Sequence, residues 1–277
     1  MMKPLTIVHL SDTHLRPKGQ LLNNSIDPWQ HMEQALLASK HFAPDAVVLT
    51  GDIADRGAPI HPVVAAKLND YQEELECPVI SIPGNHDPVG SVGPEFNTRR
   101  LSTGPRGANT VHEVMGLRII GLDSGGFQLA QGELDQDQLN WLESLLKVPA
   151  PMGSVVLLHH PPVEASSKER AGRGLQGPMA LAALIAGSDV RAILCGHYHQ
   201  AASNQLLTTP VFMAPAVSYN MNPFAPNEIL EEPGAGFAIL QVGQKSVNWT
   251  VASTEQFFSK SKDILRPAPI SGQQTAQ

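Results

Sequence analysis

The sequence predicts a protein of the α/β class. Apolar, strand-like segments alternate with helical patterns through the first two-thirds of the 277 residues. Apolar residues make up 42% of the chain and charged residues 16%, which suffices for a large buried core and excludes wholesale disorder. A chain of this length is typical of one large α/β domain or of two small domains.

The predicted strands are short apolar runs that end at polar or glycine-containing turns. Two of them, 110–114 and 117–122, are separated by only Met115 and Gly116, so we expect a hairpin there. In chain order, the predicted strands are 5–10, 46–50, 78–82, 110–114, 117–122, 154–158, 190–195, 210–214, 236–242 and 246–251.

Helices are predicted from apolar residues at helical spacing and from start signals. Asp27 followed by Pro28, for example, is a typical N-cap and first helical position. The predicted helices are 28–42, 60–75, 135–146 and 178–185, and residues 90–107 are expected to form a long loop.

The expected organisation is one domain over residues 1–259 and a polar tail over 260–277. The core of the domain covers about residues 5–215. A β-rich part without helices follows at about 210–253.

Composition limits the functions and compartments to consider. The net charge is −7 without a cluster of Lys or Arg, so we expect no nucleic-acid polymer as a partner. No apolar run reaches the 18 or so residues of a membrane span, and no secretion signal is visible, so we expect a cytoplasmic protein. The two cysteines, Cys77 and Cys195, have no metal-binding spacing, and we expect two buried reduced thiols. The oligomeric state stays open, a homo-oligomer included.

Five of the buried strands end in polar side chains that can bind a metal. Ligand sites in such sheets lie outside the carboxyl ends of the strands, so these five ends should meet. Two of the ends carry ligand candidates at positions i and i+2, which point the same way on an extended chain. The candidate ligands are Asp12, His14, Asp52, Asn85, His159, His197 and His199.

The ligand types indicate which metal ions the site binds and which reaction it catalyses. Imidazole and oxygen without thiolate suit iron or manganese, with zinc or cobalt as alternatives. Asp52 has two carboxylate oxygens and can bridge two ions. Two ions about 3.5–4 Å apart would clamp a phosphoryl group and hold a bridging hydroxide as the nucleophile. His86 is placed to serve the leaving oxygen, and Asp87 beside it to orient the imidazole of His86.

Five motifs in this order resemble the calcineurin-like metallophosphoesterases. They are Asp12-Thr13-His14, Gly51-Asp52, Gly84-Asn85-His86-Asp87, His159 and Gly196-His197-Tyr198-His199. The resemblance covers about residues 5–215. Within the superfamily the chain is similar to the branch of class III cyclic nucleotide phosphodiesterases and bacterial glycerophosphodiesterases.

The resemblance implies a four-layer α/β/β/α sandwich with a dinuclear metal site at the carboxyl ends of the strands. By analogy, one ion lies on Asp12, His14, Asp52 and His199, and the other on Asp52, Asn85, His159 and His197. Asn85, His86 and His199 would contact the substrate, with His86 and Asp87 as the catalytic residues. The implied substrate is a small phosphodiester, a cyclic nucleotide such as cAMP first.

Several alternatives stay open at this point. A glycerophosphodiesterase, a phosphomonoesterase and a non-catalytic scaffold of the same fold are the competing functions. Asp55-Arg56-Gly57 is similar to a motif of protein Ser/Thr phosphatases, although we prefer an ion pair at a helix start. His160 either supports a ligand or packs in the core. Residues 219–226 form an active-site lip, a dimer contact or a plain loop.

Overall fold

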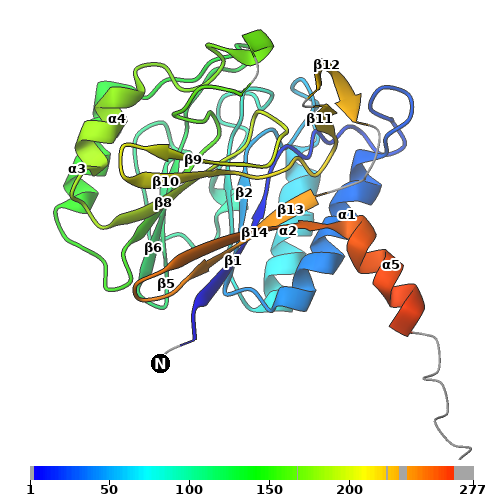
Figure 1. Ribbon diagram of the computed structural model, residues 1–277, viewed down its shortest axis with the longest axis horizontal. Helices are drawn as coiled ribbons and strands as arrows, with labels where there is room; N and C mark the ends of the chain where they lie inside the picture. Colours follow the sequence, from blue (N-terminus) through cyan, green and yellow to red (C-terminus); the bar gives the residue numbers. More distant parts are fainter. Residues whose placement is uncertain (1–2, 167, 223, 231–235, 265–277) are drawn as a thin grey trace, which may run out of the picture.

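Two β-sheets packed face to face form the centre of the molecule, and helices cover both outer faces (Figure 1). The computed structural model describes residues 3–166, 168–222, 224–230 and 236–264.

The first sheet has five strands in the order β14-β13-β1-β2-β3. Its three parallel strands, β1, β2 and β3, follow one another along the chain. The strands are β1 (Leu5–Leu10), β2 (Ala46–Thr50), β3 (Val79–Ile82), β13 (Gly236–Val242) and β14 (Val247–Ser253).

The second sheet has seven strands in the order β4-β5-β6-β7-β8-β10-β9, and β6, β7, β8 and β10 run parallel. The strands are β4 (Ser102–Thr103), β5 (Thr110–Val114), β6 (Leu117–Leu122), β7 (Ser154–Leu158), β8 (Val190–Cys195), β9 (Ala202–Leu206) and β10 (Thr209–Met213). A separate ribbon joins β11 (Asn220–Asn222) and β12 (Ala225–Leu230).

Five α-helices are described. They are α1 (Pro28–Ser39), α2 (His61–Leu75), α3 (Gln136–Leu146), α4 (Pro178–Ile185) and α5 (Thr254–Ile264).

Three layers of apolar side chains hold the four layers of structure together. Ile80 of β3 and Ile119 of β6 belong to the core between the two sheets. Met32 of α1 lies in the core between the first sheet and its helices, and Leu142 of α3 lies in the core behind the second sheet. These cores confirm the predicted α/β/β/α sandwich, because each helix layer and each sheet face has its own apolar contact.

The structure contains the helix cap and the hairpin turn that local sequence signals predicted. The Asp27 carboxylate accepts hydrogen bonds from the amides of Trp29 and Gln30 and caps α1. Met115 and Gly116 both have positive φ angles, 49° and 85°, as a two-residue hairpin turn between twisted strands requires.

Three predictions need correction. The first helix ends at Ser39, and Lys40–Phe42 form a single 3-10 turn. The expected loop over 90–107 contains a 3-10 turn at Pro94–Phe96 and the short strand β4. Helix α5 continues to Ile264, into the expected tail, whose residues 265–277 lie outside the described part.

Within the described ranges, no helix combines the length and the apolarity needed to cross a bilayer. Both cysteines are buried free thiols, as expected.

Candidate metal centre

The chain segments that follow β1, β2, β7 and β8 are hydrogen-bonded to one another. The amide of Asp12 donates to Gly51 O over 3.0 Å, and the amide of His14 donates to Asp52 O over 2.9 Å. On the other sheet, the amide of Gly196 donates to His159 O over 3.1 Å. These backbone bonds fix the strand ends, so the candidate side chains converge at one edge of the sandwich.

Backbone strain is concentrated in the same residues. A positive φ in a residue with a Cβ atom costs of order 1–2 kcal/mol and persists where the surroundings enforce it. Five of the seven candidate ligands have positive φ angles: Asp12 at 54°, His14 at 43°, Asp52 at 50°, His197 at 72° and His199 at 52°. Such strain is typical of functional sites.

Gly196 shows how closely the two sheets approach at this edge. A Cβ atom at this position would overlap Ser11 Oγ and lie 2.5 Å from Asp12 Oδ2. The absence of a side chain therefore lets the β8 loop lie directly against Asp12, whose carboxylate accepts a hydrogen bond from the amide of His197.

Four side chains form the group that we call the first cluster: Asp12, His14, Asp52 and His199. All are buried, and each offers one atom within 4.8 Å of the atoms from the others. His14 Nε2 lies 3.0 Å from His199 Nε2 and 3.5 Å from Asp52 Oδ2. His199 Nε2 lies 3.5 Å from Asp12 Oδ1.

Four side chains form the second cluster: Asp52, Asn85, His159 and His197. Asn85 Oδ1 lies 3.2 Å from His159 Nε2 and 3.0 Å from His197 Nδ1. His159 Nε2 also lies 3.4 Å from Asp52 Oδ1. Asp52 thus turns one oxygen to each cluster, which is the arrangement that a bridging carboxylate needs.

The hydrogen bonds of two histidines indicate that these clusters fit cations. His159 Nδ1 lies 2.7 Å from Thr50 O, and His199 Nδ1 lies 2.8 Å from Tyr219 O. A carbonyl can only accept a hydrogen bond, so in a neutral ring each Nδ1 carries the proton and each Nε2 a lone pair. The Nε2 lone pairs face other donor atoms of the clusters, and metal-binding histidines are oriented in the same way.

Charge in the clusters supports the same fit. Although burial opposes it, the carboxylates of Asp52 and Asp12 raise the pKa of His159 to about 9. Burial lowers the pKa values of His197 and His199 well below their usual range, so these rings are neutral and keep a lone pair. The buried carboxylates therefore favour positive charge at this centre, and His197 and His199 offer neutral imidazole to bind it.

His86 lies beside both clusters, partly exposed, in the wall of a pocket of about 490 Å³. Its Nδ1 accepts a hydrogen bond from the amide of Arg56 over 3.2 Å. In the neutral ring the proton is therefore on Nε2. Asp55 Oδ1 lies 3.5 Å from His86 Nδ1 and 3.4 Å from His14 Nδ1, so this carboxylate contacts both rings.

The hydrogen bonds of Asp87 go elsewhere than to His86, so they lend no support to the predicted orienting role. Its buried carboxylate accepts hydrogen bonds from the amides of Ile53, Ala54 and Gly84 and contacts His61 Nε2 at 2.8 Å. Asp87 joins the loop after β2 to the loop after β3.

The expected ion pair between Asp55 and Arg56 is also not formed. Asp55 Oδ2 binds Arg16 Nη2 at 2.6 Å, whereas Arg56 lines the pocket. Sequence reasoning missed further pocket residues because they lie in loops without a periodic pattern. These are Gln128, Leu129, Ala130, Arg170 and Arg173.

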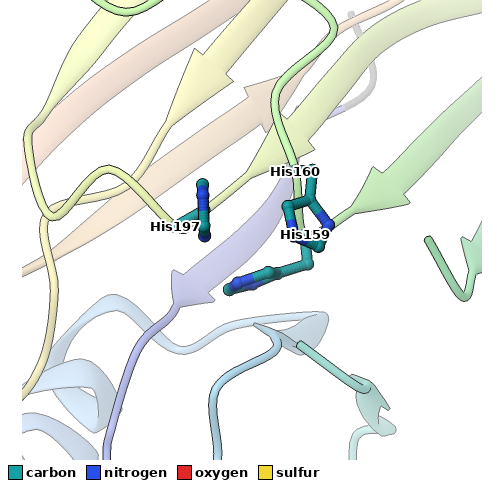
Figure 2. A group of neighbouring side chains, drawn as sticks. All are labelled: His159, His160 and His197. Atoms are coloured by element: carbon teal, nitrogen blue, oxygen red, sulfur yellow. The ribbon is translucent and has the colours of Figure 1, made fainter. Parts of the chain in front are cut away.

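Two open questions from the sequence gain structural answers. Tyr219 and Met221 line the pocket, so residues 219–221 form part of its lip. His160 is fully buried, and its Nδ1 lies 2.7 Å from Ser124 Oγ. Its ring lies next to those of His159 and His197, as Figure 2 shows.

Comparisons with known proteins agree with this geometry. A family profile described as calcineurin-like phosphoesterase matches residues 5–201. A probable cyclic nucleotide phosphodiesterase of Rhodococcus erythropolis is 35% identical over 222 residues, which are 78% of this chain and 72% of that protein. A probable glycerophosphodiester phosphodiesterase of Arcobacter nitrofigilis is 32% identical over 200 residues, 71% of this chain and 72% of that protein.

A solved structure with the same fold is a dimetal phosphatase from Danio rerio. The two share a TM-score of 0.61 at 12% identity, over 91% of this chain and 97% of the other. The extent of the profile match and the identity to the Rhodococcus protein together show that this chain belongs to the calcineurin-like phosphoesterase family.

Proposed function

We propose that this metal-dependent phosphoesterase is a phosphodiesterase that hydrolyses 3′,5′-cyclic nucleotides, with cAMP as the first substrate. The observation that carries the proposal is the position of His86, which offers a proton at Nε2 next to two clusters that fit cations. The names of the relatives in Rhodococcus and Arcobacter, both diesterases, support the same class of reaction.

The first and second clusters are the proposed binding sites of two ions, and iron or manganese is the proposed pair. Two ions bound there would polarise the phosphoryl oxygens and stabilise the charge that develops on them during the reaction. Asp52 would hold both ions, and Asn85 and His199 would contact the phosphate.

His86 is the proposed general acid. When the oxygen of a water molecule bonds to phosphorus and the bond to the 3′ oxygen breaks, the leaving oxygen becomes an alkoxide that needs a proton. The imidazolium form of His86 would transfer its Nε2 proton to this oxygen and become the neutral ring, with the remaining proton on Nδ1. Asp55, 3.5 Å from Nδ1, would stabilise the ring in this position.

Arginines at the pocket favour an anionic substrate. Arg56, Arg170 and Arg173 line it, although the whole chain carries a net charge of −7. This local concentration of positive charge would attract a phosphodiester that the rest of the surface repels.

The experiment compares His86→Gln with the wild type on cAMP and on bis(p-nitrophenyl) phosphate. We expect kcat on cAMP to fall roughly 100- to 10,000-fold, the usual contribution of a general acid. The fall on the aryl ester should be below about tenfold, because p-nitrophenolate leaves without a proton. Equal losses on both substrates would refute the role of His86. Turnover of p-nitrophenyl phosphate alone would refute the diesterase.

A glycerophosphodiesterase is the second candidate, because the Arcobacter relative carries that name. The two functions are separated by kcat/KM for cAMP and for glycerophosphoethanolamine under the same conditions. A preference for the glycerol diester would replace cAMP as the proposed substrate and leave the site assignment intact.

A further inference from the structure

His160 is a buried histidine that the proposed reaction does not use. One ring nitrogen each of His159, His160 and His197 lies within 4.8 Å of the others. The centroid of the His160 ring is 4.6 Å from that of His197 and 4.9 Å from that of His159. In Figure 2 the three rings gather beyond the ends of β7 and β8.

The two nitrogens of His160 have different surroundings. Nδ1 lies 2.7 Å from Ser124 Oγ, and this serine also receives the amide of His160 over 3.5 Å. Nε2 is buried and has no hydrogen-bond partner among the described residues. A polar atom in this position loses its water without a replacement, which is costly in a folded protein.

Neither neutral form of the ring satisfies Nε2 by itself. With the proton on Nε2, a buried donor lacks an acceptor. With the proton on Nδ1, the ring donates to Ser124 Oγ, and the Nε2 lone pair is left without a donor in a ring that packs against two other imidazoles. A cation bound at Nε2 would turn the second form into a satisfied one, and an Nδ1 hydrogen bond of this kind is typical of metal-binding histidines.

We propose that His160 Nε2 is a further ligand of the ion held by the second cluster, oriented by Ser124. This inference rests on the ligand set of the proposed function and adds one residue to it. The ion then has three imidazoles together with the oxygens of Asn85 and Asp52, whereas the ion of the first cluster has two imidazoles.

A third imidazole at the second cluster would affect which metal it binds. Imidazole suits zinc, cobalt and iron, whereas oxygen ligands suit manganese and magnesium. The second cluster should therefore select zinc or cobalt over manganese more strongly than the first cluster, and His160 should be the cause of the difference.

The experiment measures metal binding directly. The full chain is freed of metal with a chelator and titrated with Co²⁺, followed by calorimetry and visible absorption. His160→Leu is expected to weaken one of the two sites at least about 100-fold and to leave the other unchanged. In His160→Gln the amide oxygen reaches the position of Nε2. This variant should therefore recover part of the metal affinity that His160→Leu loses. Ser124→Ala should weaken the same site about 10-fold or more.

His112→Leu is the matched control. His112 is as buried as His160, but it lies in β5 and belongs to none of the three groups of candidate ligands. It should bind two ions as the wild type does. Binding of both ions to His160→Leu with wild-type affinity would overturn the proposal.

A measurement on the wild type keeps the proposal testable if His160→Leu does not fold. Protein with ¹⁵N-labelled histidine is loaded with Zn²⁺ and its imidazole nitrogens are recorded by NMR. Five metal-bound nitrogens are expected, and four would refute the role of His160. A chain that binds metal through His160 but hydrolyses no cyclic nucleotide would refute the proposed function and leave this inference standing.

Discussion

Asp87 is predicted to stabilise the fold rather than to act on His86. Its carboxylate is the acceptor for three backbone amides, at 3.0, 2.9 and 2.9 Å, and it contacts His61. In Asp87→Ala, three buried amides lose their acceptor, at about 1–3 kcal/mol each. Because the loops relax in part, we expect the free energy of unfolding to fall by about 3–6 kcal/mol.

The assay is urea unfolding of the metal-free protein, followed by circular dichroism and tryptophan fluorescence. Asp87→Asn keeps one side-chain oxygen as an acceptor for the amides, so its free energy of unfolding should fall about half as much as that of Asp87→Ala. Asp45→Asn is the control, because the Asp45 side chain accepts one amide hydrogen bond, from Thr6, far from the site. It should lose about 1 kcal/mol or less.

The alternative, in which Asp87 orients His86, predicts a different result. Turnover would then fall in Asp87→Asn while stability stayed within about 1 kcal/mol of the wild type. That outcome would refute the interpretation of Asp87 as the link between the two loops.

Two further predictions concern other buried groups. Asp55→Asn should lower kcat on cAMP about 10- to 100-fold with little change in KM, because the neutral amide no longer stabilises the rings of His86 and His14. Unchanged kcat would contradict this role. For His112, burial lowers the pKa to about 4 in the folded state. Its contribution to stability is therefore complete above the unfolded pKa of about 6.5 and is lost as the pH falls toward 4. Between pH 7.5 and pH 5, the metal-free wild type should lose about 2 kcal/mol more unfolding free energy than His112→Gln. Equal losses of unfolding free energy in the wild type and in His112→Gln between these two pH values would refute this.

The sequence predicted the parts of the site that depend on strand ends. Asp12, Asp52 and His159 each follow a buried apolar run, and parallel strands bring such positions to one edge. The pairs at i and i+2 indicated two candidate ligands from one loop. These signals are local in the chain, so pattern reasoning reaches them.

The contacts of Asp55 and Asp87 were beyond the sequence. They depend on how the loop after β2 crosses the loop after β3, where the amide of Gly57 donates to His86 O over 2.9 Å. No spacing rule says which of two neighbouring carboxylates turns toward an imidazole. Arg170 ends a short 3-10 turn (Lys168–Arg170) and Arg173 follows it, in a segment with no repeating pattern, and only the folded chain places them at the pocket.

Two of the missed elements, β9 and α5, were missed for different reasons. Strand β9 lies at the edge of its sheet, with Ser203, Asn204 and Gln205 exposed, so it lacks the apolar pattern of a buried strand. Helix α5 has a start signal, Glu255 in its first turn, but its polar composition resembled a tail.

The most direct test of the account is a crystal structure of the protein loaded with manganese, with anomalous difference density recorded at the manganese edge. We predict two peaks about 3.5–4 Å apart, one among Asp12, His14 and His199, the other beside Asn85, His159 and His197, with Asp52 between them. A single peak, or density away from these side chains, would contradict it.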